Sequence, residues 1–166
     1  GHENIIKYCN RPFKSLEHMN KEIIRRWNER VKPDDIVYHV GDFCFRSAGV
    51  RGNGIKVKAK SWRDRLNGNI IFIRGNHDKN NSVKTRIHSL VLNLNGHFIN
   101  LVHDPDFANV NHQINITGHV HEKWEIKRIK QGYSFTDCIN VGVDVWDFYP
   151  VTYEELIARY RRLINE

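Results

Sequence analysis

The sequence contains few cysteines and no long hydrophobic run. Three cysteines at unpaired spacings, Cys9, Cys44 and Cys138, indicate neither a disulfide framework nor a zinc ribbon, and they favour a reducing environment. No apolar run approaches the roughly 20 residues that cross a bilayer, and the first residues lack the charged and apolar regions of a signal peptide. We therefore expect a cytoplasmic protein that has no membrane partner.

The composition is that of a folded domain with an excess of basic residues. Hydrophobic residues make up 40% and aromatic residues 11% of the 166 residues, which excludes an intrinsically disordered chain. This length predicts one domain covering residues 1–166. Lys and Arg outnumber Asp and Glu by 26 to 19, for a net charge of +7, which favours anionic partners such as phosphorylated molecules. The composition leaves the oligomeric state open.

Hydrophobic periodicity predicts alternating helices and strands. Amphipathic spacing indicates helices over residues 15–31, 56–66 and 82–88, and from residue 152 onward. Apolar runs indicate strands over residues 35–40, 69–74, 98–102, 113–117 and 139–143, with a hairpin formed by 125–129 and 133–135. Two of these strands are almost continuously apolar, which is typical of strands covered on both faces. The predicted class is therefore α/β or layered α+β.

Four successive strands are followed by side chains that can bind a metal. The candidates are Asp42, Asn76, His103, His119 and His121. Because the carboxyl ends of strands are where open sheets place ligands, these side chains are expected to lie close together. Their mixture of oxygen and nitrogen donors suits Mn²⁺, Fe, Zn²⁺ or Ni²⁺ better than Ca²⁺ or Mg²⁺.

Each candidate taken alone also has an ordinary structural interpretation. Gly41-Asp42 after a strand is usually a turn, Asn76 is more often a turn residue, and His103 is more often a hydrogen-bonded loop histidine. The order of the four blocks is more specific than any one of them, since each block must follow its own strand.

The order of these blocks resembles the motifs of the calcineurin-like metallophosphoesterases. The matching segments are Gly41-Asp42, Gly75-Asn76-His77-Asp78, His103 and Gly118-His119-Val120-His121, and residues 1–6 and 140–146 resemble a small bacterial and phage-type subgroup. The resemblance implies a four-layer αββα sandwich of two mixed sheets, with two divalent ions, of which Mn²⁺ is the favoured one, at the strand ends. A water shared by the two ions would attack a phosphodiester or a phosphomonoester.

The resemblance also implies a role for each residue of the motifs. Asp42 would bridge the two ions, and Asn76, His103 and His119 would complete the shell of one of them. His121 would belong to the other ion. His77 would not bind metal, but would protonate the leaving group or contact the phosphate.

Two features depart from the family pattern. The family's first block, Asp-x-His, is absent, so we expect the sequence to be part of a longer protein that supplies this block and the first strand; a genuine one-metal protein is the alternative. Phe45 stands where the protein-phosphatase branch has the Asp that orients the catalytic histidine. His77 therefore needs another partner, and dephosphorylation of phosphoproteins is disfavoured.

Substrate contacts are expected from Arg46 and His2. Arg46 is a candidate cationic clamp on the phosphate, and His2 is expected to border the substrate. Residues 46–65 carry seven basic residues against one acid, which indicates either a lid over a nucleotide or nucleic acid, or simply a solvated basic face. We expect a phosphorylated small molecule or a nucleotide as substrate. A noncatalytic nucleic-acid-binding module and a one-metal regulatory protein are the alternative functions.

Overall fold

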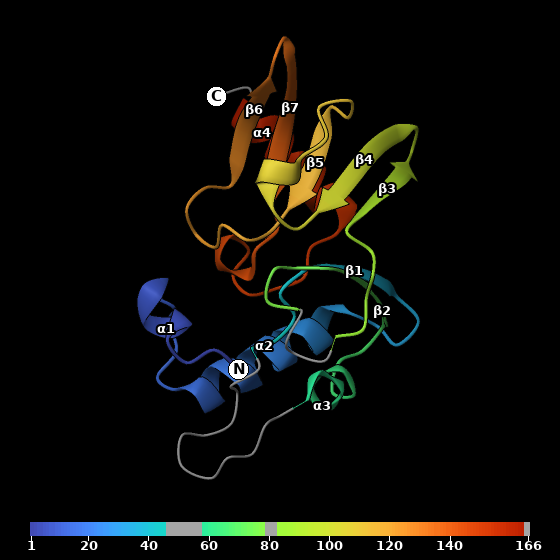
Figure 1. Cartoon of the computed structure of the whole chain (residues 1–166). Helices are drawn as coiled ribbons and strands as arrows, with labels where there is room; N and C mark the ends of the chain where they lie inside the picture. Colours follow the sequence, from blue (N-terminus) through green and yellow to red (C-terminus); the bar gives the residue numbers. More distant parts are fainter. Residues whose placement is uncertain (46–57, 79–82, 165–166) are drawn as a thin grey trace.

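Two β-sheets form the framework of the chain in a computed structural model that describes residues 1–45, 58–78 and 83–164 (Figure 1). Strands β1 (Ile36–Val40) and β2 (Asn69–Ile73) form a parallel pair. The second sheet is mixed and has the order β3-β4-β5-β7-β6. Its strands are β3 (Ser89–Leu94), β4 (His97–Val102), β5 (Ile114–Thr117), β6 (Ile126–Gln131) and β7 (Ser134–Asn140).

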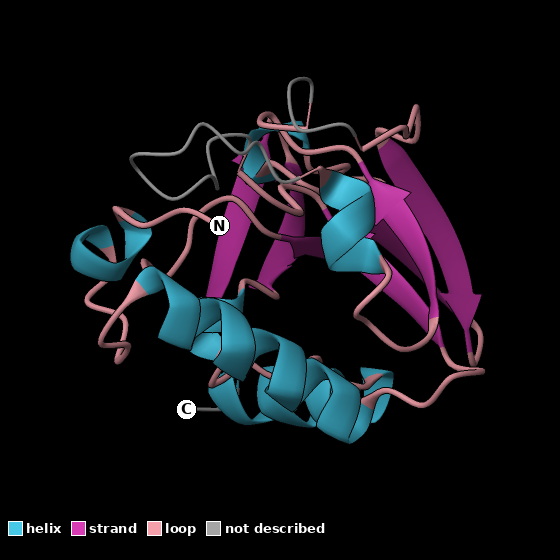
Figure 2. Cartoon of the chain, turned by 90° about the horizontal axis from the view of Figure 1, so that it is seen from below, coloured by secondary structure: helices cyan, strands magenta, loops and turns pink. Residues whose placement is uncertain are grey.

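The helices flank these sheets. They are α1 (Ile5–Tyr8), α2 (Leu16–Arg30), α3 (Ala59–Arg63) and α4 (Tyr153–Ile164), with short 3₁₀ helices η1 (Pro105–Phe107) and η2 (Val143–Val145). Seen from below, α2 and α4 lie together along one side of the strands (Figure 2), where Arg30 of α2 pairs with Glu155 of α4 at 2.9 Å. In the described ranges no helix is both long and apolar enough to cross a membrane. The expected α/β class is confirmed.

One hydrophobic core joins the two sheets and α4. Val40 and Ile73, the last residues of β1 and β2, pack with Ile99 and Leu101 of β4 and with Leu156 of α4. Strands β4, β5 and β7 run parallel to one another. The core therefore holds the carboxyl ends of β1 and β2 beside those of β4 and β5, and the loops that follow them meet.

Local sequence signals set the helix boundaries. The Ser15 hydroxyl accepts a hydrogen bond from His18 N at 3.1 Å and caps α2. At α4, Glu155 N donates to the Thr152 hydroxyl at 3.2 Å while Thr152 N donates to the Glu155 carboxylate at 3.0 Å, which forms the predicted capping box. The predicted helices 15–31 and 152 onward are confirmed. Helix 56–66 is shorter than predicted in its described part, where α3 covers Ala59–Arg63.

The four strands predicted before the candidate ligands and the hairpin are confirmed, but two other predictions are wrong. Residues 83–88 are not helical, because hydrogen bonds tie this segment to β2: the Thr85 hydroxyl donates to Phe72 O at 2.6 Å, and Arg74 N donates to Ile87 O at 2.7 Å. Strand β3, which follows, was not predicted. The fifth strand covers 134–140 instead of 139–143, because the Asn140 side chain accepts from Gly142 N at 2.8 Å and turns the chain.

His39 on β1 is expected to make the fold sensitive to acid. Its ring lies against Phe43 and Phe72, with centroids 5.2 and 5.7 Å away, and burial lowers its pKa from 6.5 to about 4. The unfolded chain binds this proton at a higher pH than the folded chain does. His39 therefore costs no stability above pH 6.5, but the free energy of unfolding falls as the pH drops toward 4, by up to about 3 kcal/mol.

Unfolding by denaturant, measured above and within this pH window, tests the prediction. The variant His39→Phe should show a smaller loss of stability on acidification than the wild type, whereas His88→Phe, at an exposed position, should behave as the wild type does. Equal acid sensitivity of His39→Phe and the wild type would contradict it.

Candidate metal centre

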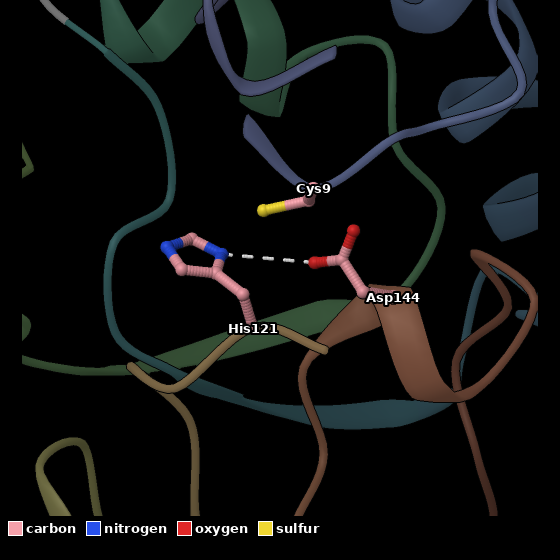
Figure 3. A group of neighbouring side chains, drawn as sticks. All are labelled: Cys9, His121 and Asp144. Carbon is pink, nitrogen blue, oxygen red and sulfur yellow. Dashed lines mark ion pairs between the residues drawn. The ribbon is translucent and has the colours of Figure 1, made fainter. Parts of the chain in front are cut away.

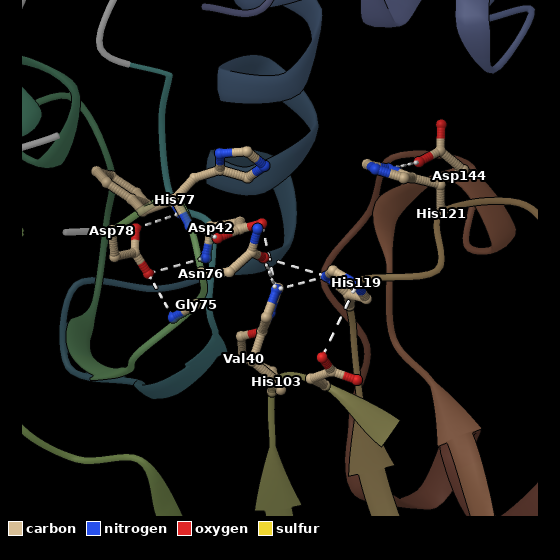
Figure 4. A network of polar contacts seen from close by, with 12 residues as sticks. Val40, Asp42, Gly75, Asn76, His77, Asp78, His103, His119, His121 and Asp144 are labelled. Atoms are coloured by element: carbon tan, nitrogen blue, oxygen red, sulfur yellow. Dashed lines mark hydrogen bonds and ion pairs between the residues drawn. The ribbon is translucent and has the colours of Figure 1, made fainter. Parts of the chain in front are cut away.

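Four of the predicted ligands meet where the loops after β1, β2, β4 and β5 converge (Figure 4). His103 Nε2 lies 3.2 Å from Asp42 Oδ2 and 3.0 Å from Asn76 Oδ1. His119 Nδ1 lies 3.1 Å from the same Asn76 oxygen and 3.3 Å from His103 Nε2. The His103 side chain is 5% exposed and that of His119 is 38% exposed, so the group has a buried base and an open side that a substrate can approach.

The tautomer of His103 shows that this group fits a cation. His103 Nδ1 lies 2.8 Å from the carbonyl oxygen of Val40, and since a carbonyl only accepts, Nδ1 carries a proton. In the neutral ring Nε2 then presents a lone pair to the oxygens of Asp42 and Asn76. Three electron-rich atoms that face one another repel each other, and a metal ion bound between them removes this repulsion. A backbone carbonyl that accepts a hydrogen bond from the other ring nitrogen commonly holds a ligating histidine in place.

The pKa values of His103 and Asp42 shift because the two side chains interact. Burial lowers the pKa of His103, but hydrogen bonds to Asp42 and to Val40 O outweigh it and raise the pKa above the usual value. For Asp42 burial acts in the opposite direction and raises the pKa, but its contacts with His103 and with the backbone N–H of His77 bring the pKa below the usual value. The two oxygens and two nitrogens suit Mn²⁺, Fe, Zn²⁺ or Ni²⁺.

The backbone around the ligands adopts conformations that are rare elsewhere. Asp42, His119 and His121 have positive φ angles of 55°, 68° and 51°, which cost energy in residues that carry a Cβ and often occur at functional sites. Gly75 is required for packing, because a Cβ there would overlap the amide nitrogen and Oδ1 of Asp42. The glycine before Asn76 thus allows the loops after β1 and β2 to touch.

Asp78 connects these two loops. Its buried carboxylate accepts hydrogen bonds from the backbone N–H groups of Gly75 at 2.8 Å, Asp42 at 2.9 Å and Phe43 at 3.1 Å. This role was not predicted, although Asp78 is the last residue of the Gly-Asn-His-Asp block. The carboxylate positions Asp42 through its backbone, so it supports the centre without belonging to the ligand group.

His77 lies beside the ligands without joining them. Its backbone N–H donates to Asp42 Oδ1 at 2.8 Å, and its exposed ring lies 5.7 Å from that of Phe45. Phe45 stacks in turn on His2, with centroids 4.2 Å apart. The expected substrate contacts His2 and His77 therefore both lie beside Phe45, whereas Arg46 lies outside the described residues.

The structure places His121 in a different group from the other predicted ligands. His121 Nδ1 lies 3.7 Å from Asp144 Oδ2, and one ligand atom each of Cys9, His121 and Asp144 lie within 4.8 Å of one another. In Figure 4 the His121 and Asp144 side chains point toward each other, apart from the other ligands. Neither Cys9 nor Asp144 was predicted as a ligand. Asp144 lies in the segment 140–146 that carried part of the resemblance, whereas no sequence signal marks Cys9.

Comparison with known proteins identifies relatives, although no family model matches the sequence. "Uncharacterized protein MJ1445" of Methanocaldococcus jannaschii is 37% identical over 161 residues, which cover 95% of this chain and 84% of that protein. The crystal structure of AQ665 from Aquifex aeolicus, a protein of unknown function, has a TM-score of 0.66 at 22% identity over 95% of this chain and 92% of that one. A predicted phosphoesterase from Streptococcus pneumoniae TIGR4 reaches a TM-score of 0.36 at 20% identity, over 75% and 64% of the two chains. The chain therefore belongs to the same protein family as MJ1445.

Proposed function

We propose that this protein is a dinuclear, metal-dependent phosphoesterase that hydrolyses a phosphodiester or phosphomonoester, with a nucleotide-like molecule as the favoured substrate. The observation that carries the proposal is the convergence of Asp42, Asn76, His103 and His119, in which Asp42 contacts His103, and His103, His119 and Asn76 contact one another. The order of the motifs along the chain supports the same reaction class. The net charge of +7 suits an anionic substrate.

The four residues would hold one ion, and His121 would contribute to a second. When bound, such ions polarise the phosphoryl oxygens and lower the pKa of a water molecule so that it can attack phosphorus. Mn²⁺ is the favoured ion, with Fe, Zn²⁺ or Ni²⁺ as alternatives. Two contacts of Asp42 support this role: its backbone N–H donates to Asp78, and its Oδ2 lies 3.2 Å from His103 Nε2.

His77 would act as the general acid. Its ring is exposed next to the ligands, and its backbone is fixed by the hydrogen bond from its N–H to Asp42 Oδ1 at 2.8 Å. A histidine in this place can give its proton to the departing alkoxide, a contribution of about 10²-fold to 10⁴-fold in rate. Phe45, which stands at the sequence position where the protein-phosphatase branch has an acid, packs beside the ring. His2, which stacks on Phe45, and Arg46 would contact the substrate.

Hydrolysis of two phosphodiesters by the Mn²⁺-loaded protein tests this function. An aryl diester has a good leaving group that needs little protonation, whereas an alkyl diester has a poor one. We expect chelator to abolish both activities, and His77→Ala to lower kcat for the alkyl diester by about 10²-fold or more while affecting the aryl diester less. His97→Ala, at an exposed position at the start of β4, should change neither.

Other outcomes would favour a different function. Equal losses for both diesters in His77→Ala would contradict the general-acid role. Absence of hydrolysis with any divalent ion, together with salt-sensitive nucleic-acid binding that chelator and His119→Ala leave unchanged, would favour the noncatalytic binding module. One ion per chain by elemental analysis, again without hydrolysis, would favour the one-metal regulatory protein.

A further inference from the structure

A second group of metal-binding side chains lies outside the four-residue centre. Cys9, His121 and Asp144 come from distant parts of the sequence, and one ligand atom of each lies within 4.8 Å of the others (Figure 3). Around a tetrahedral zinc ion, donor atoms at 2.0 to 2.3 Å from the metal are separated by about 3.3 to 3.8 Å. The group therefore needs to contract by only about 1 Å to surround an ion.

The buried side chain of Asn140 holds two of these residues in place. Its Nδ2 donates to the carbonyl oxygen of His121 at 2.6 Å, and its Oδ1 accepts from Gly142 N, at the start of the turn that carries Asp144, at 2.8 Å. Asn140 is completely buried at the end of β7. The loop after β5 and the turn after β7 are thus joined through one amide, which fixes the spacing of His121 and Asp144.

Arg11, two residues after Cys9, ties the segment that follows α1 to Asp144. Its guanidinium donates to both oxygens of Asp144, from Nε to Oδ1 at 2.7 Å and from Nη2 to Oδ2 at 2.8 Å. Burial raises the pKa of Asp144, but hydrogen bonds with His121 and Arg11 bring it below the usual value, so the carboxylate is ionised. Each oxygen of a carboxylate has a second lone pair, and Asp144 can therefore accept from Arg11 and bind an ion at the same time.

Cys9 follows α1, where its N–H donates to Ile5 O at 3.0 Å. Burial and then hydrogen bonding to Glu122 raise the pKa of the thiol to about 12. A thiol binds zinc as the thiolate, so Cys9 would release its proton as the bond to the ion forms.

We propose that Cys9, His121 and Asp144 form a second metal site that takes a borderline-soft ion, with Zn²⁺ as the best match. Thiolate, imidazole and carboxylate are the donors that zinc uses, whereas Mg²⁺ and Ca²⁺ prefer oxygen alone. Three protein ligands leave the fourth tetrahedral position open, as in catalytic zinc sites. The assignment rests on the proposed function, because it expects a second ion at His121. The ligands of that ion are then Cys9, His121 and Asp144, and Asp42 is not one of them.

Substitution with Co²⁺ tests the site without measuring activity. A thiolate bound to Co²⁺ gives an intense charge-transfer absorption in the near ultraviolet, which nitrogen and oxygen ligands do not produce. We expect the full chain to show this band, Cys9→Ser to lose it, and His121→Ala to weaken or lose it. Elemental analysis of the zinc-loaded chain should show one ion fewer for Cys9→Ser than for the wild type.

Two control variants separate this site from the four-residue centre. Cys44→Ser should keep the band, although Cys44 lies close to Asp42 in sequence. His119→Ala should also keep the band while losing hydrolysis. Hydrolysis without a thiolate band, or a band lost in Cys44→Ser and kept in Cys9→Ser, would overturn the Cys9 site and leave the proposed function intact. A Cys9-dependent band in a chain without hydrolase activity would support the site and count against the phosphoesterase.

Discussion

Replacing Asp42 with alanine is expected to lower kcat/KM for phosphoester hydrolysis by about 10³-fold or more, equivalent to roughly 4 kcal/mol of transition-state stabilisation. The physical reason is that Asp42 is the only anionic side chain among the four converging residues, and its Oδ2 lies 3.2 Å from His103 Nε2. Without this charge the centre would hold a divalent ion far less tightly. Kinetics at saturating and limiting Mn²⁺, together with metal content by elemental analysis, measure both effects.

Two further variants make this result specific. Asp42→Asn keeps an oxygen that can accept from the His77 N–H, so it should fold normally and still lose most of the activity. Asp34→Ala, at an exposed position after α2, should behave as the wild type. If Asp42→Asn retained wild-type activity and metal content, the four-residue centre would not be the catalytic one.

Asp78→Ala is expected to give the largest loss of stability among the residues of the centre, about 3 kcal/mol or more in the free energy of unfolding. Its carboxylate is 4% exposed and accepts three backbone hydrogen bonds, from Gly75, Asp42 and Phe43. Alanine would leave these three N–H groups without their acceptor. Because one of them belongs to Asp42, metal affinity should also fall, by about 10-fold to 100-fold, as for other residues that support ligands.

The variant Asp78→Asn provides a graded control. Oδ2 of Asp78 accepts from Gly75 and Asp42, and Oδ1 accepts from Phe43. An amide can keep the first two contacts with its oxygen and lose the third, so its loss of stability should be smaller than that of alanine. Denaturant unfolding of the metal-free chains measures this order. Stability of Asp78→Ala within about 0.5 kcal/mol of the wild type, the usual range for surface substitutions, would show that the three contacts contribute little.

The residues of the centre that could be predicted are those that directly follow a strand, because their position in the sequence indicates their position at the edge of the sheet. Asp42, Asn76, His103 and His119 each follow a strand, and strands whose carboxyl ends meet at one edge must bring such residues near one another. The structure brings these four together. The resemblance to the metallophosphoesterases named the same residues, since it depends on the same order of strands and motifs.

The predictions that failed concern segments whose structure depends on distant partners. Residues 83–88 have helical periodicity, but the hydrogen bond from Thr85 to Phe72 O ties them to β2. Strand β3 was missed although Leu90, Leu92 and Leu94 alternate, and these residues are partly buried against the core that joins the sheets. Local propensity is weaker than such tertiary contacts, which is why pattern alone misassigned this stretch.

By itself the sequence determined the α/β class, the strands that precede the ligands, and the four residues that lie at their ends, because period, caps and strand-end motifs are local properties. Only the tertiary structure decided that Asp78 holds two loops together and that His121 lies with Cys9 and Asp144 instead of with Asp42. These groupings depend on how the sheets, α1 and η2 pack against one another. Packing is a property of the whole chain, and the spacing of residues along the sequence does not contain it.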